Sequence, residues 1–383
     1  MATPGEKGKI KVAWIFGAGF SKPLRAPLFN ELLTEPQLEW LKAAYKSTDE
    51  KIYTDAESVH AVYQKGFGKQ WRHAETFLDI VSRMVSNDSP DQNLIAGMIG
   101  NPDDLLWFPA KVRRTVAAQC AHFLNGVRPH EDEDWLAFRD WARDLSDFDS
   151  IITFNYDCVL EKLSEWRSQQ SDNRPEQGHF RFINPNRVDR SAIANSARSY
   201  MEMTATKRPS ICKMHGSVSW IRESGDRISI GDSSDAAIRQ LKDIAIGIPG
   251  RDKMELSGLQ FRPIHDFARN AIAAAQKIVV IGYSFPSTDT AATSLIEKAI
   301  AGCLDHDVVE IILVNNDSKA LTRISENFQS RLDDSRTLYV ANGRRPKPNL
   351  VNKKGKKQVH IRLLEETTED YISRIDRVNG RLY

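Results

Sequence analysis

The feature that most constrains the fold is a regular alternation of apolar runs and amphipathic segments in the last third of the chain. Residues 277–282 (KIVVIG) and 308–314 (VVEIILV) are short, β-branched and apolar, which is typical of buried strands. Segments 267–276, 290–301 and 319–332 carry apolar residues at helical spacing. This alternation predicts parallel strands joined by helical crossovers.

Two earlier runs, 10–16 and 150–154, also end at polar loops and predict strands of the same sheet. Between them, stretches 74–85, 105–124 and 135–145 have helical spacing, so we expect a mostly helical insertion. Beyond the second run we expect a helix over 158–168 and a short strand over 179–183. The expected fold class is α/β, a Rossmann-like parallel sheet with helices on both faces plus the insertion.

We expect the chain to form a single domain over residues 1–383. The segments expected to build its parts are 9–35, 147–167, 208–222 and 264–342 for the Rossmann-like core, 36–146 for the helical insertion, and 343–383 for a basic loop and tail.

Composition narrows the class of protein. The 383 residues are 41% hydrophobic and carry a net charge of +2, so no global field attracts nucleic acid or an anionic membrane. The four cysteines form no C-x-x-C pair, which disfavours a thiolate zinc module and a disulfide framework. Without a signal-like or membrane-spanning apolar stretch, we expect a cytoplasmic protein.

One segment is strongly biased. Residues 344–357 hold seven basic residues and no acidic one. We interpret Arg344 to Lys357 mainly as a solvated loop between two late strands. A patch that contacts nucleic acid or an acidic partner is the alternative.

The first candidate ligand loop is GAGFS, which follows the first strand. Its glycines permit a tight turn and let backbone amides approach a pyrophosphate. The third glycine of the dinucleotide fingerprint is replaced by Lys22, so a glycine turn without a ligand remains an alternative. The candidate cofactor-binding residues here are Gly17, Ala18, Gly19, Phe20 and Ser21.

Two further motifs carry groups suited to catalysis. In TFNYD, Asn155 can hold a water or a ribose hydroxyl and Asp157 can accept hydrogen bonds from sugar hydroxyls, although both residues are also common helix caps. In MHGS, His215 is either a general base or a satisfied structural histidine, and Gly216 allows a close backbone approach.

The last two motifs follow the late strands. Gly282, Tyr283 and Ser284 of IGYSF suit a phosphate, and Asn315 and Asn316 of VNND suit a ribose or an adenine edge. Ordinary strand-to-helix turns with good capping residues are the alternative for both. In parallel sheets, however, ligands bind at the carboxyl ends of strands, where all these motifs lie.

Together, the five motifs resemble the sirtuin superfamily, and specifically the stand-alone sirtuin-like proteins of bacterial antiphage defence. GAGFS is similar to the family's first nucleotide loop, TFNYD to its asparagine-and-aspartate motif and MHGS to its catalytic histidine motif. GYS is similar to its small-residue phosphate loop, and VNN to its adenosine-contacting loop. The resemblance covers residues 9–22, 148–165, 208–222 and 276–318.

The resemblance implies an NAD hydrolase that releases nicotinamide and ADP-ribose, with NAD as substrate and no metal. His215 would be the base, Asn155 would position the water, and Asp157 would hold the ribose or its own loop. The family's four-cysteine zinc module and the acidic residue after the first loop are both missing, which disfavours a protein deacylase. A catalytically silent NAD or ADP-ribose binding scaffold is the other alternative.

The resemblance also implies a cellular role, as effector of an antiphage system that depletes NAD. Because unregulated NAD cleavage would harm the host, we expect control through oligomerisation, the insertion or a second protein. The expected partners are further copies of the chain and a HerA-type ATPase encoded nearby.

Overall fold

The computed structural model describes residues 11–84, 90–99, 101, 103–169, 179–183, 185, 208–223, 227–231, 238–240, 242–248, 261–286, 289–303, 308–329, 336–342 and 357–374. The α-helices are α1 (Glu35–Tyr45), α2 (Glu50–Gly66), α3 (Ala74–Arg83), α4 (Pro90–Ala96), α5 (Asp103–His122), α6 (Leu136–Asp144), α7 (Val159–Gln169), α12 (Arg262–Ala273), α13 (Thr290–Cys303), α14 (Ser318–Gln329) and α15 (Thr368–Ile372). The strands are β1 (Val12–Phe16), β2 (Ser150–Thr153), β3 (Arg181–Phe182), β4 (Ser210–Lys213), β5 (Gly216–Glu223), β6 (Arg227–Ile230), β7 (Ile244–Ile246), β8 (Lys277–Ile281), β9 (Val308–Asn315), β10 (Arg336–Asn342) and β11 (Lys357–Glu365). Four short 3-10 turns are η1 (Ala18–Phe20), η2 (Lys22–Leu24), η3 (Phe29–Glu31) and η4 (Glu133–Trp135).

Eight of these strands form one parallel sheet in the order β10-β11-β9-β8-β1-β2-β4-β3. β1 lies in the middle, with Phe16 opposite Thr153 of β2 and Ile281 of β8. The predicted α/β class with a Rossmann-like parallel sheet is confirmed. Because the strands are parallel, all the polar loops that follow them meet at one edge.

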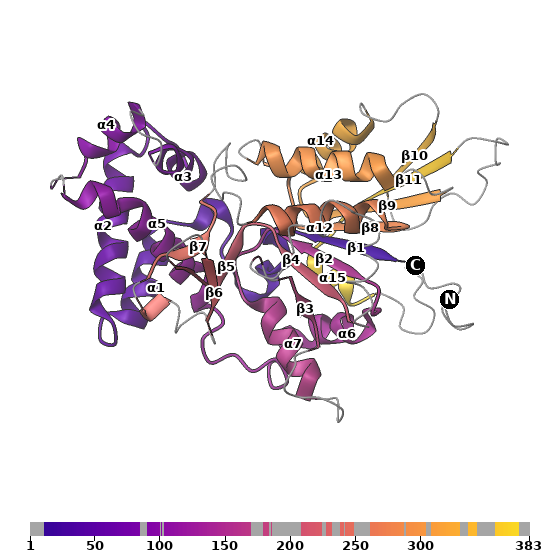
Figure 1. Cartoon of the computed structure of the whole chain (residues 1–383), viewed down its shortest axis with the longest axis horizontal. Coiled ribbons are helices and arrows are strands. Elements are labelled where there is room, and N and C mark those ends of the chain that lie inside the picture. The colour runs from indigo at the N-terminus through magenta and orange to yellow at the C-terminus, as the bar shows by residue number, and fades with distance from the viewer. Residues whose placement is uncertain are drawn as a thin grey trace.

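Both faces of the sheet are buried, as expected for a parallel sheet. Alternate residues of β1 divide between two apolar clusters: Trp14 and Phe16 face one, Ala13 and Ile15 the other. Figure 1 shows α12, α13 and α14 over one face and α6, α7 and α15 over the other. The strands are therefore held rigidly, which fixes the positions of the loops that follow them.

Residues 36–146 are mostly helical, as the spacing predicts, but they divide between two places. Helices α1 to α5 form a lobe beside the sheet (Figure 1), and α5 packs against the three-stranded antiparallel sheet β6-β5-β7. Helix α6 instead packs against α7 and α15, where Trp141 contacts Trp14 edge-on at a 5.6 Å ring-centroid separation. Helix α6 is thus part of the layer that covers the main sheet.

The C-terminal segment corrects the expected domain layout. We assigned residues 343–383 to a basic loop and tail outside the core, although we also expected the loop to lie between two late strands. The second of these strands, β11, pairs with both β9 and β10 inside the sheet. Its apolar residues Val359, Ile361 and Leu363 alternate with polar ones, which is the spacing typical of a strand. Residues 344–356 of the basic segment lie outside the described residues.

Candidate active site

The carboxyl edge of the main sheet borders a cavity of about 750 Å³. Loops after β1, β2, β4, β8, β9 and β11 all contribute to its wall. The sequence-predicted residues that line it are Gly17, Ala18, Gly19, Asn155, Asp157, His215, Gly282, Tyr283, Ser284, Asn315 and Asn316. Residues more than 290 positions apart in the chain thus share one cavity.

Two predicted residues of the first loop, Phe20 and Ser21, lie below this wall. The turn of η1 directs Phe20 into the core, where its ring stacks on Phe16 at 3.9 Å between centroids. Ser21 is buried and its hydroxyl accepts a hydrogen bond from Nδ2 of Asn155 at 3.1 Å. Ser21 therefore supports the neighbouring loop, and neither Phe20 nor Ser21 is among the residues that line the cavity.

The glycines of the first and fourth loops have a role that the sequence analysis missed. The Gly17 amide donates to Ile281 O at 3.1 Å and the Gly19 amide to Gly282 O at 3.0 Å. A Cβ on any of these glycines would collide with the backbone of the facing loop. Both glycine loops therefore pack against each other, and these two amides serve this contact.

His215 follows β4 and is only 2% exposed. Its ring lies between Phe154 and Tyr156, at centroid separations of 4.9 and 6.4 Å. Its backbone is fixed on both sides, because Gly247 N donates to His215 O at 2.9 Å and His265 Nε2 lies 3.0 Å from Met214 O. The imidazole is thus a rigidly held group that borders the cavity.

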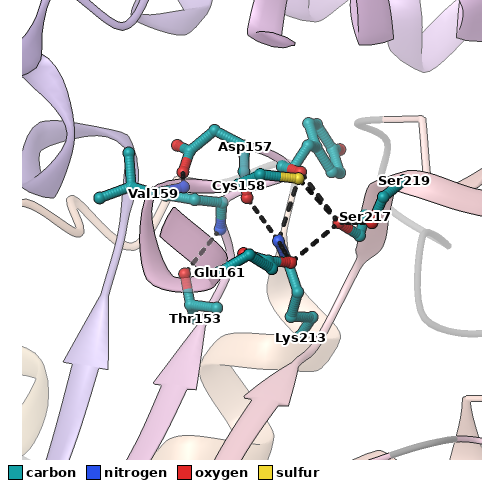
Figure 2. Close-up of polar contacts among 10 residues, drawn as sticks. Thr153, Asp157, Cys158, Val159, Glu161, Lys213, Ser217 and Ser219 are labelled. Atoms are coloured by element: carbon teal, nitrogen blue, oxygen red, sulfur yellow. Dashed lines mark hydrogen bonds and ion pairs between the residues drawn. The ribbon is translucent and has the colours of Figure 1, made fainter. Parts of the chain in front are cut away.

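The TFNYD loop rests on a buried charged cluster, shown in Figure 2. Nζ of Lys213 donates to Asp157 O and lies 2.8 Å from Oε1 of Glu161. Burial lowers the pKa of Lys213, but the charges of Glu161, Cys158 and Asp157 outweigh it and raise the pKa above its ordinary value. Lys213 is therefore a charged anchor under the loop that carries Asn155.

Asp157 lies at the start of α7 and also in the cavity wall. Its Oδ1 accepts a hydrogen bond from Val159 N at 3.0 Å, which is the capping geometry at the start of α7, and the residue also borders the cavity. Burial raises the pKa of the carboxyl, opposed by Lys213 and by hydrogen bonds from Val159 and Ser21. The cap holds the carboxyl in place at the wall.

Asp289, which the sequence motifs did not single out, also lines the cavity. Its Oδ1 lies 3.4 Å from His215 Nε2, and its Oδ2 accepts a hydrogen bond from the Tyr283 hydroxyl at 3.0 Å. Burial, with the Asp289 charge, raises the pKa of Tyr283 well above its ordinary value. In the sequence, Asp289 directly precedes the helix expected at 290–301, a position that indicates a helix cap.

The helical insertion supplies part of the wall, a role that its sequence did not indicate. Residues from this lobe and the loop before it that border the cavity include Phe29, Leu32, His73, Glu75 and Cys120. The segment after β11 also borders the cavity, and Thr368 Oγ1 there donates to Gly19 O at 2.8 Å.

The charged residues of the wall are predominantly acidic. Among its described residues the one Lys or Arg is Lys22, whose Nζ lies 2.6 Å from Glu31 Oε1. The carboxylates of the wall are those of Glu75, Asp157, Asp289, Asp317, Glu366 and Glu369. Within the described part of the chain, no group of three or more His, Cys, Asp or Glu side chains has a metal-binding arrangement.

Comparison with known proteins points to the same part of the chain. Residues 149–336 match the family model of the SIR2-like domain, a range that begins just before β2 and ends at the first residue of β10. It contains the TFNYD, MHGS, GYS and VNN motifs, whereas GAGFS lies outside it. No curated protein matches the chain.

The match supports a sirtuin-like family and an NAD-related function. Among the helices that the structure describes, none combines the length and apolarity needed to cross a bilayer.

Proposed function

We propose that the protein is an NAD hydrolase. The observation that carries this proposal is the meeting of His215, Asn155 and two paired glycine loops in one cavity at the carboxyl edge of a parallel sheet. Such an edge is where this class of fold binds dinucleotides. The SIR2-like match over residues 149–336 supports the same ligand.

The nicotinamide end belongs beside β2 and β4, where His215 and Asn155 lie. The adenosine end then belongs beside β9 and β11, where Asn315 and Asn316 border the cavity. For the pyrophosphate between them, we assign the amides of Ala18, Tyr283 and Ser284, because the amides of Gly17 and Gly19 bond to the facing loop.

Cleavage breaks the bond between the nicotinamide nitrogen and the ribose anomeric carbon. The bonding pair leaves with nicotinamide and neutralises the ring, while the ribose gains oxocarbenium character. Water adds its oxygen to the anomeric carbon, and its proton passes to the His215 imidazole. The carboxylates of the wall stabilise the cationic sugar electrostatically.

Asn155 is suited to orient the attacking water. The residue is 8% exposed, and its side-chain amide Nδ2 donates to the Ser21 hydroxyl at 3.1 Å. A fixed amide presents its carbonyl oxygen in one direction, which is the requirement for placing a water beside the anomeric carbon.

At the cellular level, we propose that this activity serves antiphage defence by depleting NAD, in homo-oligomers associated with a HerA-type ATPase. The support is the resemblance of the five motifs to the stand-alone defence proteins. Sizing chromatography with and without the ATPase tests the assembly, and a chain that remains monomeric in both would contradict it.

Product analysis tests the proposed chemistry. Incubating the purified chain with NAD, with and without the ATPase, should release nicotinamide and ADP-ribose in equal amounts by chromatography. An acetyl-lysine peptide in the same reaction should keep its acetyl group. Intact NAD in both reactions, or deacetylated peptide, would refute the proposal.

A further inference from the structure

The Asp289 carboxylate lies between two side chains of the candidate active site. It is 4% exposed and immediately precedes α13, whose first backbone bond runs from Thr293 N to Asp289 O at 3.0 Å. Oδ1 lies 3.4 Å from His215 Nε2, and Oδ2 accepts from the Tyr283 hydroxyl at 3.0 Å. The Tyr283 ring is itself fixed by stacking on Phe154 at 4.4 Å.

We propose that Asp289 is a positioning residue for His215, an inference that rests on the proposed NAD hydrolysis. A carboxylate on the Nε2 side favours the tautomer with its proton on Nε2 and leaves Nδ1 as the proton acceptor. It also stabilises the imidazolium that forms when the water proton arrives. The Tyr283 hydroxyl keeps the carboxylate in this orientation.

The surroundings of the carboxylate favour this assignment. The titratable groups that face it are His215 after β4, Tyr283 after β8, Tyr156 after β2 and His265 of α12. Burial lowers the pKa of His265, and its Nε2 already faces Met214 O, so it does not compete for the carboxylate. Burial raises the pKa of Tyr156, whose hydroxyl donates to Gly247 O. His215 is therefore the imidazole that the carboxylate serves.

Asp289→Asn tests the pair, because asparagine keeps the size and removes the charge. We expect kcat for nicotinamide release to fall at least about tenfold, with KM changed less than about threefold. The pKa of the His215 imidazole, measured by NMR titration, should fall by about one unit because the favourable negative charge is lost. Asp132→Asn is the matched control, since Asp132 also precedes a helical turn but lies outside the cavity wall.

A second variant guards against misfolding of the first. Tyr283→Phe keeps the ring that stacks on Phe154 and should lower kcat severalfold by releasing Oδ2. Unchanged kcat in both variants, or a loss of kcat in Asp289→Asn without a shift of the His215 pKa, would overturn the positioning role. Because the NMR titration needs no turnover, it tests the pair even if the wild-type chain leaves NAD intact. Intact NAD would contradict the proposed function but not the pairing of Asp289 with His215.

Discussion

At single residues, burial shifts the pKa of ionisable side chains, and Asp149 is one example. Asp149 lies at the opposite edge of the sheet from the cavity, 5% exposed, and accepts hydrogen bonds from Trp14 Nε1 at 3.3 Å and Ser146 N at 3.2 Å. Burial raises the pKa of its carboxyl to about 7, although these hydrogen bonds lower it. Asp149 is therefore an acid that the fold holds partly protonated near neutral pH.

This pKa predicts a pH-dependent stability. The folded-state pKa is above the ordinary value of 3.8, so the contribution of Asp149 is complete below about pH 4 and is lost as the pH rises through about 7. A shift of about three pKa units corresponds to about 4 kcal/mol. Asp149→Asn should flatten the fall in Tm between pH 4 and 8 measured by calorimetry. An identical pH dependence in wild type and variant would refute the assignment.

Gly216 gives a second prediction at this scale. Its φ of 82° is in the left-handed region, and a Cβ there would meet the Ala245 carbonyl. Gly126 has a similar φ of 73° but open space around it, so it is a matched control. Gly126→Ala should cost about 1 kcal/mol from backbone strain alone, and Gly216→Ala about 1–3 kcal/mol more from the clash. Equal losses in chemical denaturation would show that strain, and not the β7 contact, requires this glycine.

Among the helices and strands, the strand ends fix where the loops of the candidate site begin, and so determine the positions of those loops. β2 and β4 run parallel with Thr153 opposite Lys213, so the two residues that follow each strand lie next to each other. Asn155 lies two residues after Thr153 in the sequence, and His215 lies two residues after Lys213. The register, more than any local contact, brings the two candidate catalytic side chains together.

The Lys213 and Glu161 pair links β4 to α7 and can be tested by a double-mutant cycle. Lys213→Met removes the charged partner of the largely buried Glu161 carboxylate and the donor to Asp157 O, so it should cost about 3 kcal/mol. Glu161→Gln should cost less, and the two changes together should show a coupling of at least about 1 kcal/mol in denaturant unfolding. Strictly additive losses would contradict a direct structural pair.

Sequence reasoning located the loops because each motif follows an apolar run, and parallel strands bring such loops together. It did not find Asp289 or Glu75, since their approach to the cavity depends on how the following helices are packed. It also did not predict that the amides of Gly17 and Gly19, which line the cavity, bond across to β8 and its loop. Such contacts between distant segments have no signature in local spacing.

At the scale of the whole molecule, the sheet depends on its last strand. β11 is the neighbour of both β9 and β10, so its loss would leave β10 without a partner and expose the edge of β9. The segment after it also borders the cavity and contacts the first glycine loop through Thr368. The C-terminal part thus joins the core and the site.

Truncation tests this dependence. A chain ending at residue 342 should lose cooperative thermal unfolding and near-UV circular dichroism, because an internal strand is missing. A chain ending at residue 374 keeps every described residue and should melt like the full chain. Wild-type melting of the shorter form would show that β11 is dispensable.

The most direct test of the account is the rate of nicotinamide release by His215→Ala. A general base contributes about 10² to 10⁴ in rate, so turnover should fall at least about a hundredfold while Tm changes little. His130→Ala, with a half-exposed side chain outside the cavity wall, should behave as wild type. A destabilised His215→Ala that keeps its turnover per folded molecule would instead make His215 a packing residue and contradict the account.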